Sequence, residues 1–570
     1  MEITDSSPPR VAIRSITFSD DTIVNCDQRD VVVIVGPNNA GKSEALRGIL
    51  NKAKNPAVLS PVVKSIELER VGSIDEVESW ISKFATRDVI SNPANPSFAA
   101  FGSVVHVSQI RNYWTIPANG LGELTRFMCH LLTSAERLTT ANPADAIMLT
   151  SAALVHPIHF LQKYDQLEER ISILFRRAFD MDLVVHRNAG SRVPLYVGDR
   201  PKVEPGEDRA SFTYTQRLEK LNPIEQQGDG VRSFAGVLLH ATVGKESILL
   251  IDEPEAFLHP PQARMLGRML VEAKSENRQV LVATHSGDVL RGVLDGNAGS
   301  VRVVRVRRDG NQNHVKELDR AAVNALWVDP LLRSSNILDG VFHERVIVCE
   351  GDADARFFTA MADALFDGPL ADRRKPDVMF THCGGKGRLP LVVRSLKALD
   401  VPVLATPDFD ILRDEHPLDV LVAAAGGDWS ELRAHWHSVK TAIDSIRPQM
   451  STHDVKDRVS KILEGIGEPI FPRPAKTEIE NVLKQTSAWS LAKQLGRGFV
   501  PAGTPTQQYN LLNQKLRALG IRIIEVGELE RFCPSIGGHG PSWAIEALSK
   551  DLINDPELEP ARQYVTEIMS

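Results

Sequence analysis

The feature that most constrains the fold of this chain is a run of β-branched residues, Val31–Val35, that leads directly into a glycine-bearing loop. Such a run is typical of a strand that is buried on both faces of a parallel sheet. The loop from Gly36 to Ser43 matches the pattern GxxxxGKS/T, and the stretch from Lys42 to Lys52 is compatible with a helix. A buried strand, a phosphate-binding loop and a helix in this order predict an α/β fold with a nucleotide site.

The loop supplies each residue type that the phosphates of a nucleotide require. Gly36 and Gly41 leave room for backbone N–H groups to approach the phosphates at the start of the helix. Lys42 is predicted to reach the β- and γ-phosphates, and Ser43 to ligate Mg²⁺. Asn39 is assigned to the same surface. We therefore expect ATP and Mg²⁺ to bind at this loop.

A second apolar run ends in two carboxylates. Ile248–Ile251 precedes Asp252 and Glu253. Together with the phosphate loop, this arrangement predicts that Asp252 holds Mg²⁺ and that Glu253 polarises the attacking water. A helix-compatible stretch from Pro260 to Lys274 and an apolar run at Val280–Ala283 follow, and we expect all three strands to lie in one sheet.

The chain length requires more than one domain, because 570 residues exceed the size at which a single hydrophobic core stops growing, and roughly two to four domains are expected. We assign residues 1–335 to the first domain. Apolar residues between about 120 and 180 recur at helical spacing, which predicts an inserted helical hairpin at about 115–185. The spacing alone leaves two interpretations open, an ordinary packed helical layer or a dimerisation arm.

A new α/β unit begins near residue 340, and we assign residues 340–570 to it. Three strand-like runs alternate with helix-like stretches in the βαβ order that builds a parallel sheet. These runs are Val346–Cys349, Asp377–Phe380 and Val401–Ala405. A helical insertion is expected at about 415–510. The last predicted elements are a strand from Ile521 to Val526 and a helix after Pro541.

Two acid clusters follow strands of this second unit. Glu350 and Asp354 come after the first strand, and Asp408 and Asp410 come after the third. Because the carboxyl ends of parallel strands share one edge of a sheet, these carboxylates could meet around hard cations. Two such ions could activate water and stabilise the leaving oxygen of a phosphodiester. Taken alone, each cluster is better explained as a solvated loop.

The first half of the chain resembles the ABC-type ATPases. The segment LLIDEPEAFLHP, which contains Glu253 and His259, and the segment VATHS, which contains His285, are similar to the Walker B, D-loop and switch-histidine segments of that family. The resemblance implies a nucleotide-sandwich dimer in which Glu253 and His285 act in hydrolysis. It also places Gly228 and Gly230 where the family's signature segment binds nucleotide, although QGDGVRS departs from LSGGQ and argues against a transporter.

The second half resembles the Toprim domains, which carry a glutamate after one strand and a DxD pair after a later one. Here Glu350, Asp408 and Asp410 form that pattern. An ABC-type ATPase followed by a Toprim domain is similar to the OLD (overcoming lysogenisation defect) family of nucleases, which includes the Gabija-type antiphage nucleases. The resemblance covers nearly the whole chain and implies that the carboxylates bind metal ions.

The same resemblance implies further site residues late in the chain. Gly527 to Glu530 is similar to a late acidic motif of the OLD Toprim domain, so Glu530, and with it Glu528, would complete the metal set. A catalytic lysine is expected after this motif. Ser542 stands at the corresponding position, which leaves Lys550 or Lys386 as the substitute.

We therefore expect an ATP-regulated, divalent-metal-dependent DNA endonuclease with Glu350, Asp408 and Lys386 as catalytic residues, and with ATP and Mg²⁺ or Mn²⁺ as cofactors. The family implies an antiphage role, a homo-dimer or higher homo-oligomer, and an accessory protein such as a helicase. The alternative is an ATP-driven DNA-binding clamp or scaffold whose Toprim domain is inactive. A topoisomerase would need a tyrosine nucleophile, and only Tyr509 and Tyr564 follow residue 340.

The composition of the chain bears on where in the cell the protein is expected. The five cysteines are scattered and form no CxxC pair, which argues against a disulfide framework or a zinc ribbon. No stretch approaches the roughly 20 apolar residues of a membrane span, and the N-terminus does not resemble a signal peptide, so a cytoplasmic protein without a membrane partner is expected. The net charge of −7 does not decide a DNA role, because phosphate binding needs only a local basic surface.

Overall fold

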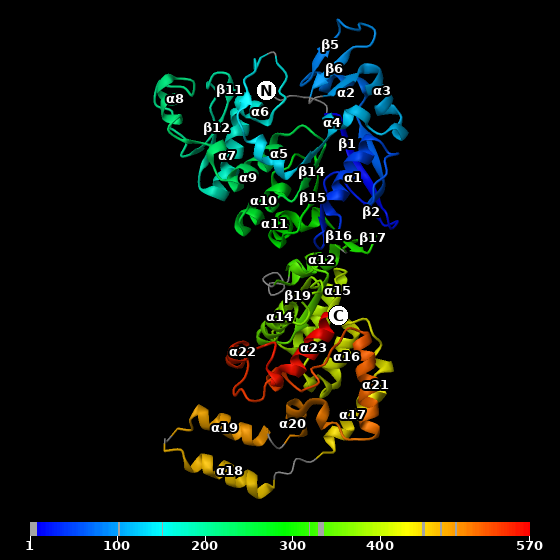
Figure 1. The fold of residues 1–570 in the computed structure, drawn as a ribbon. Helices are drawn as coiled ribbons and strands as arrows, with labels where there is room; N and C mark the ends of the chain where they lie inside the picture. The colour runs from blue at the N-terminus through cyan, green and yellow to red at the C-terminus, as the bar shows by residue number, and fades with distance from the viewer. Residues whose placement is uncertain are drawn as a thin grey trace. The chain divides into compact units, whose positions relative to one another are not determined.

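A computed structural model of the protein describes residues 8–100, 103–150, 152–318, 320–328, 336–446, 451–467, 470–484 and 487–570. The chain forms two compact units, Met1–Asp329 and Pro330–Ser570 (Figure 1). Within the described residues, no helix is both long enough and apolar enough to cross a membrane.

A six-stranded sheet forms the centre of the first unit. Its strands run parallel except for the edge strand β17, which is antiparallel to its neighbour. In order across the sheet they are β17 (Gln312–Glu317), β16 (Val301–Asp309), β3 (Val31–Val35), β15 (Gln279–Ala283), β14 (Ile248–Asp252) and β8 (Cys129–Leu132). The three strands expected from the sequence, β3, β14 and β15, are therefore neighbours in one sheet, as predicted.

Helices follow the strands of this sheet, and two of them pack with their backbones close together. α1 (Lys42–Lys54) follows β3, α10 (Pro260–Glu272) follows β14, and α11 (Gly287–Asn297) follows β15. A Cβ atom on Gly267 of α10 would lie 2.4 Å from the Val289 carbonyl oxygen, and one on Gly292 of α11 would lie 1.9 Å from the Arg264 carbonyl oxygen. Only glycine allows this approach.

A second, antiparallel sheet shares the core of the first unit. Its strand order is β2 (Ile23–Asn25), β1 (Arg10–Phe18) and β4 (Val63–Val71). One hydrophobic cluster contains residues of this sheet, such as Ile16, together with Ile34 of β3 and Leu250 of β14. The strand that precedes the phosphate loop is therefore buried on both faces, which explains its β-branched composition.

The predicted helical hairpin at about 115–185 is wrong over its first part. The segment contains α4 (Thr125–Met128), α5 (Ser134–Thr140), α6 (Pro157–Lys163) and α7 (Asp165–Phe179), but Cys129–Leu132 is the strand β8, paired with β14. The apolar spacing predicted one continuous helix here. In the structure the buried Phe127 and Met128 are the last residues of α4, whereas the buried Leu132 belongs to β8. A dimerisation role for this region stays a prediction.

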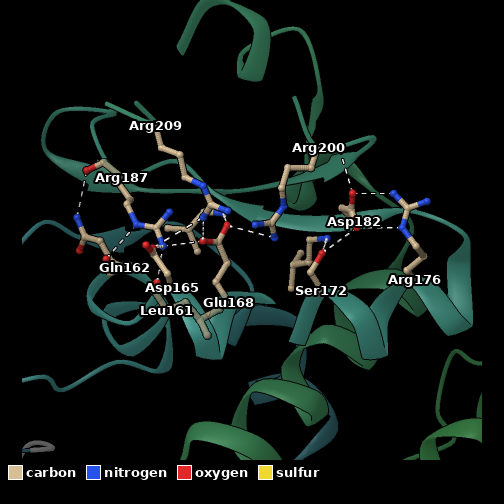
Figure 2. A network of polar contacts seen from close by, with 12 residues as sticks. Leu161, Gln162, Asp165, Glu168, Ser172, Arg176, Asp182, Arg187, Arg200 and Arg209 are labelled. Carbon is tan, nitrogen blue, oxygen red and sulfur yellow. Dashed lines mark hydrogen bonds and ion pairs between the residues drawn. The ribbon is translucent and has the colours of Figure 1, made fainter. Parts of the chain in front are cut away.

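A network of charged side chains joins α7 to the strands that follow it (Figure 2). Glu168 on α7 is 1% exposed, and it accepts hydrogen bonds from Arg187 at 2.6 Å and Arg209 at 2.9 Å. Arg187 follows β10 (Asp182–Val185), which pairs with β12 (Leu195–Gly198). Removing the arginines would leave Glu168 as an uncompensated buried charge, a change that costs about 3–5 kcal/mol in buried ion pairs.

Three parallel strands form the sheet of the second unit, in the order β19 (Val378–His382), β18 (Arg345–Cys349) and β20 (Val403–Thr406). α14 (Asp352–Asp367) follows β18, and α15 (Leu389–Ala398) lies between β19 and β20. The expected βαβ order is therefore present. β18 lies in the middle, so the chain leaves β18 and β20 at the same edge of the sheet.

The predicted strand from Ile521 to Val526 is wrong as a regular strand. Only Ile521 forms a bridge, to Ala405 of β20. The segment runs beside β20, since Arg522 N donates to Ala405 O at 2.8 Å, but its outer carbonyls have other partners: Tyr564 Oη donates to Arg522 O at 2.7 Å and Arg497 N to Glu525 O at 2.8 Å. These hydrogen bonds take the place of those that the outer side of the segment would make with another strand.

Most of the remaining elements in the described part of the second unit are helices. Those between residues 415 and 518 are α16 (Glu415–Ala424), α17 (Arg433–Asp444), α18 (Thr452–Glu464), α19 (Arg473–Lys484), α20 (Ala488–Leu495) and α21 (Thr504–Ala518). The last two helices, α22 (Pro541–Leu548) and α23 (Glu559–Met569), pack on α14 around the fully buried Trp543. The helix expected after Pro541 is present.

Candidate functional site

The phosphate loop joins β3 to α1 in a conformation that only certain residues allow. Gly36 has φ 147°, and a Cβ atom there would lie 2.0 Å from the Val306 carbonyl oxygen of β16. Gly41 precedes α1 with φ 96°, and Asn39 has φ 60°. The two glycines and the asparagine predicted at this surface therefore occupy positions where positive φ or close backbone approach is required.

Lys42 and Ser43 bond to neighbouring groups of this loop. The Lys42 side chain is 8% exposed, and its Nζ donates to Gly36 O at 2.9 Å and Pro37 O at 2.8 Å. Burial lowers the pKa of this ammonium group. Ser43 Oγ donates to Asp252 Oδ1 at 2.8 Å, and burial raises the pKa of Asp252. The structure thus brings together the two residues predicted to ligate Mg²⁺.

His285 lies beside both Glu253 and Glu255, and Glu255 was not predicted from the sequence. His285 Nδ1 lies 3.5 Å from Glu253 Oε1 and 3.2 Å from Glu255 Oε1. Glu255 is 8% exposed, its Oε1 also accepts from the His285 N–H at 2.9 Å and from Thr284 Oγ1 at 2.8 Å, and burial raises its pKa. Glu255 therefore fixes the position of His285 beside Glu253. Its signal in the sequence was the second glutamate of the segment IDEPE.

Arg137 is the second residue of this site that sequence reasoning missed. It is fully buried on α5 and donates to the backbone carbonyls of Asp252 and Glu253, the latter at 2.9 Å, and to Ser233 Oγ at 3.1 Å. Ser233 lies on α9 (Asp229–Val243). Arg137 therefore holds the backbone of the acid pair against two helices.

The predicted signature glycines lie at the start of α9. Gly228 precedes the helix and is exposed, and a Cβ atom on Gly230 would lie 2.5 Å from the Phe257 carbonyl oxygen. His259 directly precedes α10. The binding of a partner's nucleotide by Gly228 and Gly230 stays a prediction.

In the second unit, three of the four predicted acids converge. Ligand oxygens of Glu350, Asp408 and Asp410 all lie within 4.8 Å of one another. The Asp408 N–H donates to Glu350 Oε1 at 3.1 Å. Burial raises the pKa of Glu350 to about 7 and raises the pKa of Asp408 well above its ordinary value. Like charges held this close favour a cation.

Asp354 lies on the first turn of α14 beside a second group of possible ligands. Its Oδ2 accepts from the Gly351 N–H at 3.1 Å, and burial raises its pKa to about 6. With Glu528, Glu530 and His539 it lines a cavity of about 400 Å³. Ligand atoms of these last three residues also lie within 4.8 Å of one another. Sequence reasoning had named Asp354, Glu528 and Glu530, but not His539.

A lysine from a distant helix contacts three acids of the site. Lys493 Nζ on α20 lies 3.0 Å from Asp408 Oδ2, 3.7 Å from Glu528 Oε2 and 3.9 Å from Asp410 Oδ2. Burial alone would lower the pKa of Lys493, but these carboxylates raise it. No sequence signal pointed to this lysine, because α20 reaches the site only through tertiary packing.

The two lysines named from the sequence have different positions. Lys386 Nζ donates to Asp410 Oδ2 at 3.0 Å and therefore borders the acid cluster. Lys550 Nζ instead contacts Glu557 at 2.8 Å, Ser535 at 2.9 Å and Asp555 at 3.3 Å. Lys386 and Lys493 are thus the lysines seen to contact the predicted metal ligands in the described part of the chain.

The donor chemistry of the site fits divalent cations. Carboxylate oxygens are the ligands that Mg²⁺ and Mn²⁺ prefer. Asp410 Oδ1 is buried and has no hydrogen-bond partner among the described residues, so it is available to a ligand. Burial, and after it the charge of neighbouring acids, raises the pKa of Glu350 and of Asp354 although Lys493 lowers both.

Two family models match the chain. Residues 120–291 match the model described as "AAA domain, putative AbiEii toxin, Type IV TA system". Residues 341–410 match the model described as "Overcoming lysogenization defect protein-like, TOPRIM domain". The second match contains Glu350, Asp354, Asp408 and Asp410.

Two curated relatives are OLD nucleases. That of Thermus scotoductus is 30% identical over 182 residues, which are 29% of this chain and 31% of the relative. That of Escherichia phage P2 is 26% identical over 180 residues, which are 30% of this chain and 29% of the relative. The chain therefore aligns with about a third of the length of these relatives.

Solved structures similar to the chain include Smc head domains. The head domain from Thermotoga maritima is 12% identical, covers 54% of this chain and 99% of its own length, and has a TM-score of 0.29. The one from Pyrococcus furiosus is 11% identical, covers 56% and 98%, and has a TM-score of 0.33. The fold assignment does not rest on these low scores.

The matched models define the class of this protein as an ATPase domain followed by a Toprim domain in one chain, which confirms the predicted fold class. Within that class, the Toprim model and the two relatives make the chain similar to the OLD family of ATPase–Toprim proteins. The resemblance inferred from the sequence is thereby confirmed.

Proposed function

We propose that this protein is a divalent-metal-dependent DNA endonuclease whose cleavage is regulated by ATP. The observation that carries the proposal is the convergence of Glu350, Asp408 and Asp410 around shared ligand positions, with the ammonium group of Lys493 among them. This combination can hold cations and bind a phosphodiester in one place. The names of the relatives, OLD nucleases, support the same activity.

The acids would hold the metal ions, and the backbone positions them. Glu350, Asp408 and Asp410 form one ligand set, Glu528, Glu530 and His539 form a second, and Asp354 lines the cavity beside the second set. Bound Mg²⁺ or Mn²⁺ would supply Lewis-acid stabilisation of the phosphate and an activated water. The hydrogen bond from the Asp408 N–H to Glu350 Oε1 holds these two acids next to each other before a metal ion binds.

Lys493 would bind the scissile phosphate and give a proton to the leaving oxygen. Its position is fixed by unusually close backbone packing between α20 and the turn that carries Glu528. A Cβ atom on Gly527 would lie 2.1 Å from the Lys493 carbonyl oxygen, and one on Gly496 would lie 2.0 Å from the Glu525 carbonyl oxygen. Lys386, at 3.0 Å from Asp410, would be a second phosphate-binding cation.

The first unit would bind and hydrolyse ATP. Lys42 would release its loop carbonyls to reach the phosphates, and Ser43 with Asp252 would hold Mg²⁺. Glu253 would polarise water beside His285. Gly228, which is exposed, and the partly buried Gly230 would complete the site of a second copy, which makes a homo-dimer or higher homo-oligomer part of the proposal.

The family resemblance extends the proposal to antiviral defence and to an accessory protein such as a helicase. The five cysteines are buried and unpaired, which supports a reducing, cytoplasmic setting. A topoisomerase is less well supported, because Tyr509 is fully buried and the Tyr564 hydroxyl is engaged by Arg522 O.

A plasmid-nicking assay on the full chain tests the proposal. The protein with Mg²⁺ or Mn²⁺ should nick DNA, and Asp408→Ala should abolish nicking while ATP binding is kept. Asp372→Ala, at an exposed aspartate of the same unit, is the matched control and should cleave normally. Binding of DNA without cleavage under any metal and nucleotide condition would instead support the clamp or scaffold with an inactive Toprim domain.

A further inference from the structure

A cavity in the first unit contains none of the residues assigned above to either site. Its volume is about 680 Å³, and residues of α1, α6, α9 and the edge strand β8 contribute to its lining. Cavities of roughly 300–1,000 Å³ that combine an apolar lining with a few polar groups are typical of small-molecule sites. Here apolar side chains such as Leu131, Phe160 and Val243 lie beside buried polar groups.

His240, one of the lining residues, has an unused hydrogen-bond acceptor. It is 8% exposed, and its Nε2 lies 3.3 Å from Thr140 Oγ1. The Thr140 hydroxyl donates its one proton to Glu136 O at 2.9 Å, so Thr140 Oγ1 accepts from His240 Nε2. Burial lowers the pKa of His240 to about 3, so the ring is neutral and Nδ1 carries a lone pair. Among the described residues, this buried Nδ1 has no hydrogen-bond partner.

Glu246 provides a second acceptor of the same kind in the lining. Its Oε2 is buried and likewise has no partner in the part of the chain that the structure describes. Burial alone would raise the pKa of Glu246, but the nearby His130, His240 and Arg278 lower it, so the carboxyl group is ionised at neutral pH. Leaving a buried acceptor unpaired is unfavourable, so both atoms favour a ligand that donates hydrogen bonds.

Packing holds the two acceptors in place. The ring of His240 stacks on that of His130, with centroids 4.4 Å apart and planes inclined by 10°. His130 Nε2 in turn lies 3.3 Å from Glu136 Oε1. A Cβ atom on Gly244 would lie 2.6 Å from Glu246 Oε2, so the backbone packs directly against this carboxylate. A ligand would therefore meet a site whose polar groups are already ordered.

The charges around the cavity favour an uncharged ligand. The carboxylates of Glu136 and Glu246 and the ammonium groups of Lys54 and Lys245 line the same space, so neither an anion nor a cation is favoured by the balance of charge. Within the described residues, neither His240 nor Glu246 belongs to a group of three side chains whose ligand atoms could hold a metal ion. A neutral molecule with N–H donors fits these conditions.

We propose that this cavity binds a neutral nitrogen heterocycle of the nucleobase type, whose amino or ring N–H groups donate to His240 Nδ1 and Glu246 Oε2. The apolar faces of such a ring suit the apolar part of the lining. Lys42 begins the 13-residue helix α1, which is about 20 Å long, and Lys54 at its other end lines the cavity. The site is therefore distinct from that of ATP, and the inference does not depend on ATP hydrolysis or DNA cleavage. The competing explanation is a cavity that holds only water.

Calorimetry on the full chain, with the phosphate loop occupied by Mg²⁺ and a non-hydrolysable ATP analogue, tests the proposal. The probes are guanosine, adenosine and cytidine, and trimethylxanthine, a purine without N–H groups, is the ligand control. At least one nucleoside should bind saturably, and the control should not. Glu246→Gln should weaken this binding about tenfold or more. Glu225→Gln is the matched control, because Glu225 Oε2 is also buried without a partner among the described residues but lies outside this cavity.

A blocking variant tests the location independently. Val155 lines the cavity and is 43% exposed, so Val155→Trp can fill the cavity without entering the core, and it should abolish nucleoside binding. Val89→Trp, at a valine that is also 43% exposed, should not. Failure of all three nucleosides to bind, equal binding of trimethylxanthine, or binding unchanged by Glu246→Gln or Val155→Trp would overturn the proposal. Nucleoside binding that both variants weaken, in a protein that never cleaves DNA, would support this site and count against the endonuclease.

Discussion

The nucleotide site of the first unit and the acid cluster of the second differ in how their charges are balanced. In the first, Lys42 bonds to two carbonyls of its own loop, and Ser43 bonds to Asp252. In the second, burial holds the pKa of Glu350 at about 7 and that of Asp354 at about 6, although Lys493 is close to the cluster. In the first site Lys42 and Ser43 are hydrogen-bonded before a ligand binds. In the second, Lys386 and Lys493 contact Asp410 and Asp408, but the carboxylates outnumber these lysines, and a cation would balance the excess.

The sites also differ in how they are assembled. The groups of the first come mainly from short segments directly after β3, β14 and β15. Those of the second come from loops and helices spread between Glu350 and His539. The first site should therefore depend on a few local residues, and the second on packing between distant segments.

The largest effect is expected from Glu253→Gln in the first unit. ATP hydrolysis should fall about 10³-fold, because a general base is removed, while ATP binding persists through Lys42 and Ser43. The measurement is steady-state hydrolysis together with nucleotide binding, and exposed Glu276→Gln is the control. Metal-dependent cleavage measured without ATP should not change. Hydrolysis at the wild-type rate would show that Glu253 is not the base.

The next largest effect is expected from Lys493→Met. Cleavage should fall about 10²-fold through loss of phosphate binding and proton donation, while metal affinity is kept or rises because a competing ammonium group is gone. Single-turnover cleavage and metal titration test both parts. Lys550→Met, at a lysine bonded to Glu557, should leave cleavage within about twofold. A loss of metal binding in Lys493→Met would favour a purely structural lysine.

Gly527→Ala should damage the second site without touching the first. Gly527 has φ 120°, and its Cβ would lie 2.1 Å from Lys493 O, so the second unit should lose about 2 kcal/mol, or roughly 30-fold in the unfolding constant. Denaturant unfolding and cleavage should both report this loss, and ATP hydrolysis should not. Gly498→Ala, where nothing lies within 4 Å of the added Cβ, is the matched control. Equal stability of the two variants would contradict the close packing.

Acid should weaken metal binding in the second unit. Carboxylates bind a cation only when ionised, and the pKa values of Glu350, about 7, and Asp354, about 6, mean that protons compete as pH falls from about 8 to about 6. The affinity should drop about tenfold per pH unit for each proton displaced. Calorimetry in buffers of different ionisation enthalpy measures the proton release. A pH-independent affinity would show that these acids are not the ligands.

The parts predicted from sequence were those encoded locally. Val31–Val35, the loop to Ser43 and the pair Asp252 and Glu253 are contiguous, so strand, turn and helix chemistry alone defines them. The convergence of Glu350 with Asp408 followed from the rule that parallel strands end at one edge.

The parts that were missed depend on tertiary packing. Arg137 and Lys493 reach their sites from helices whose sequences carry no motif, and His539 lies in a loop recognised only by its contact with Glu530. Cys129–Leu132 was misread because a short buried strand and a helix can share the same apolar spacing. Long-range pairing, here with β14, decided between them.

The close approach of Gly36 to Val306 has a mechanical consequence. Val306 lies on β16, and β16 leads through β17 to α12 (Arg320–Val328), the last helix of the first unit. Because a Cβ atom on Gly36 would lie only 2.0 Å from the Val306 carbonyl oxygen, the backbone of the phosphate loop packs directly against that of β16. A movement of the phosphate loop on nucleotide binding would therefore displace β16 first, and through β17 it would reach α12, after which the chain enters the second unit.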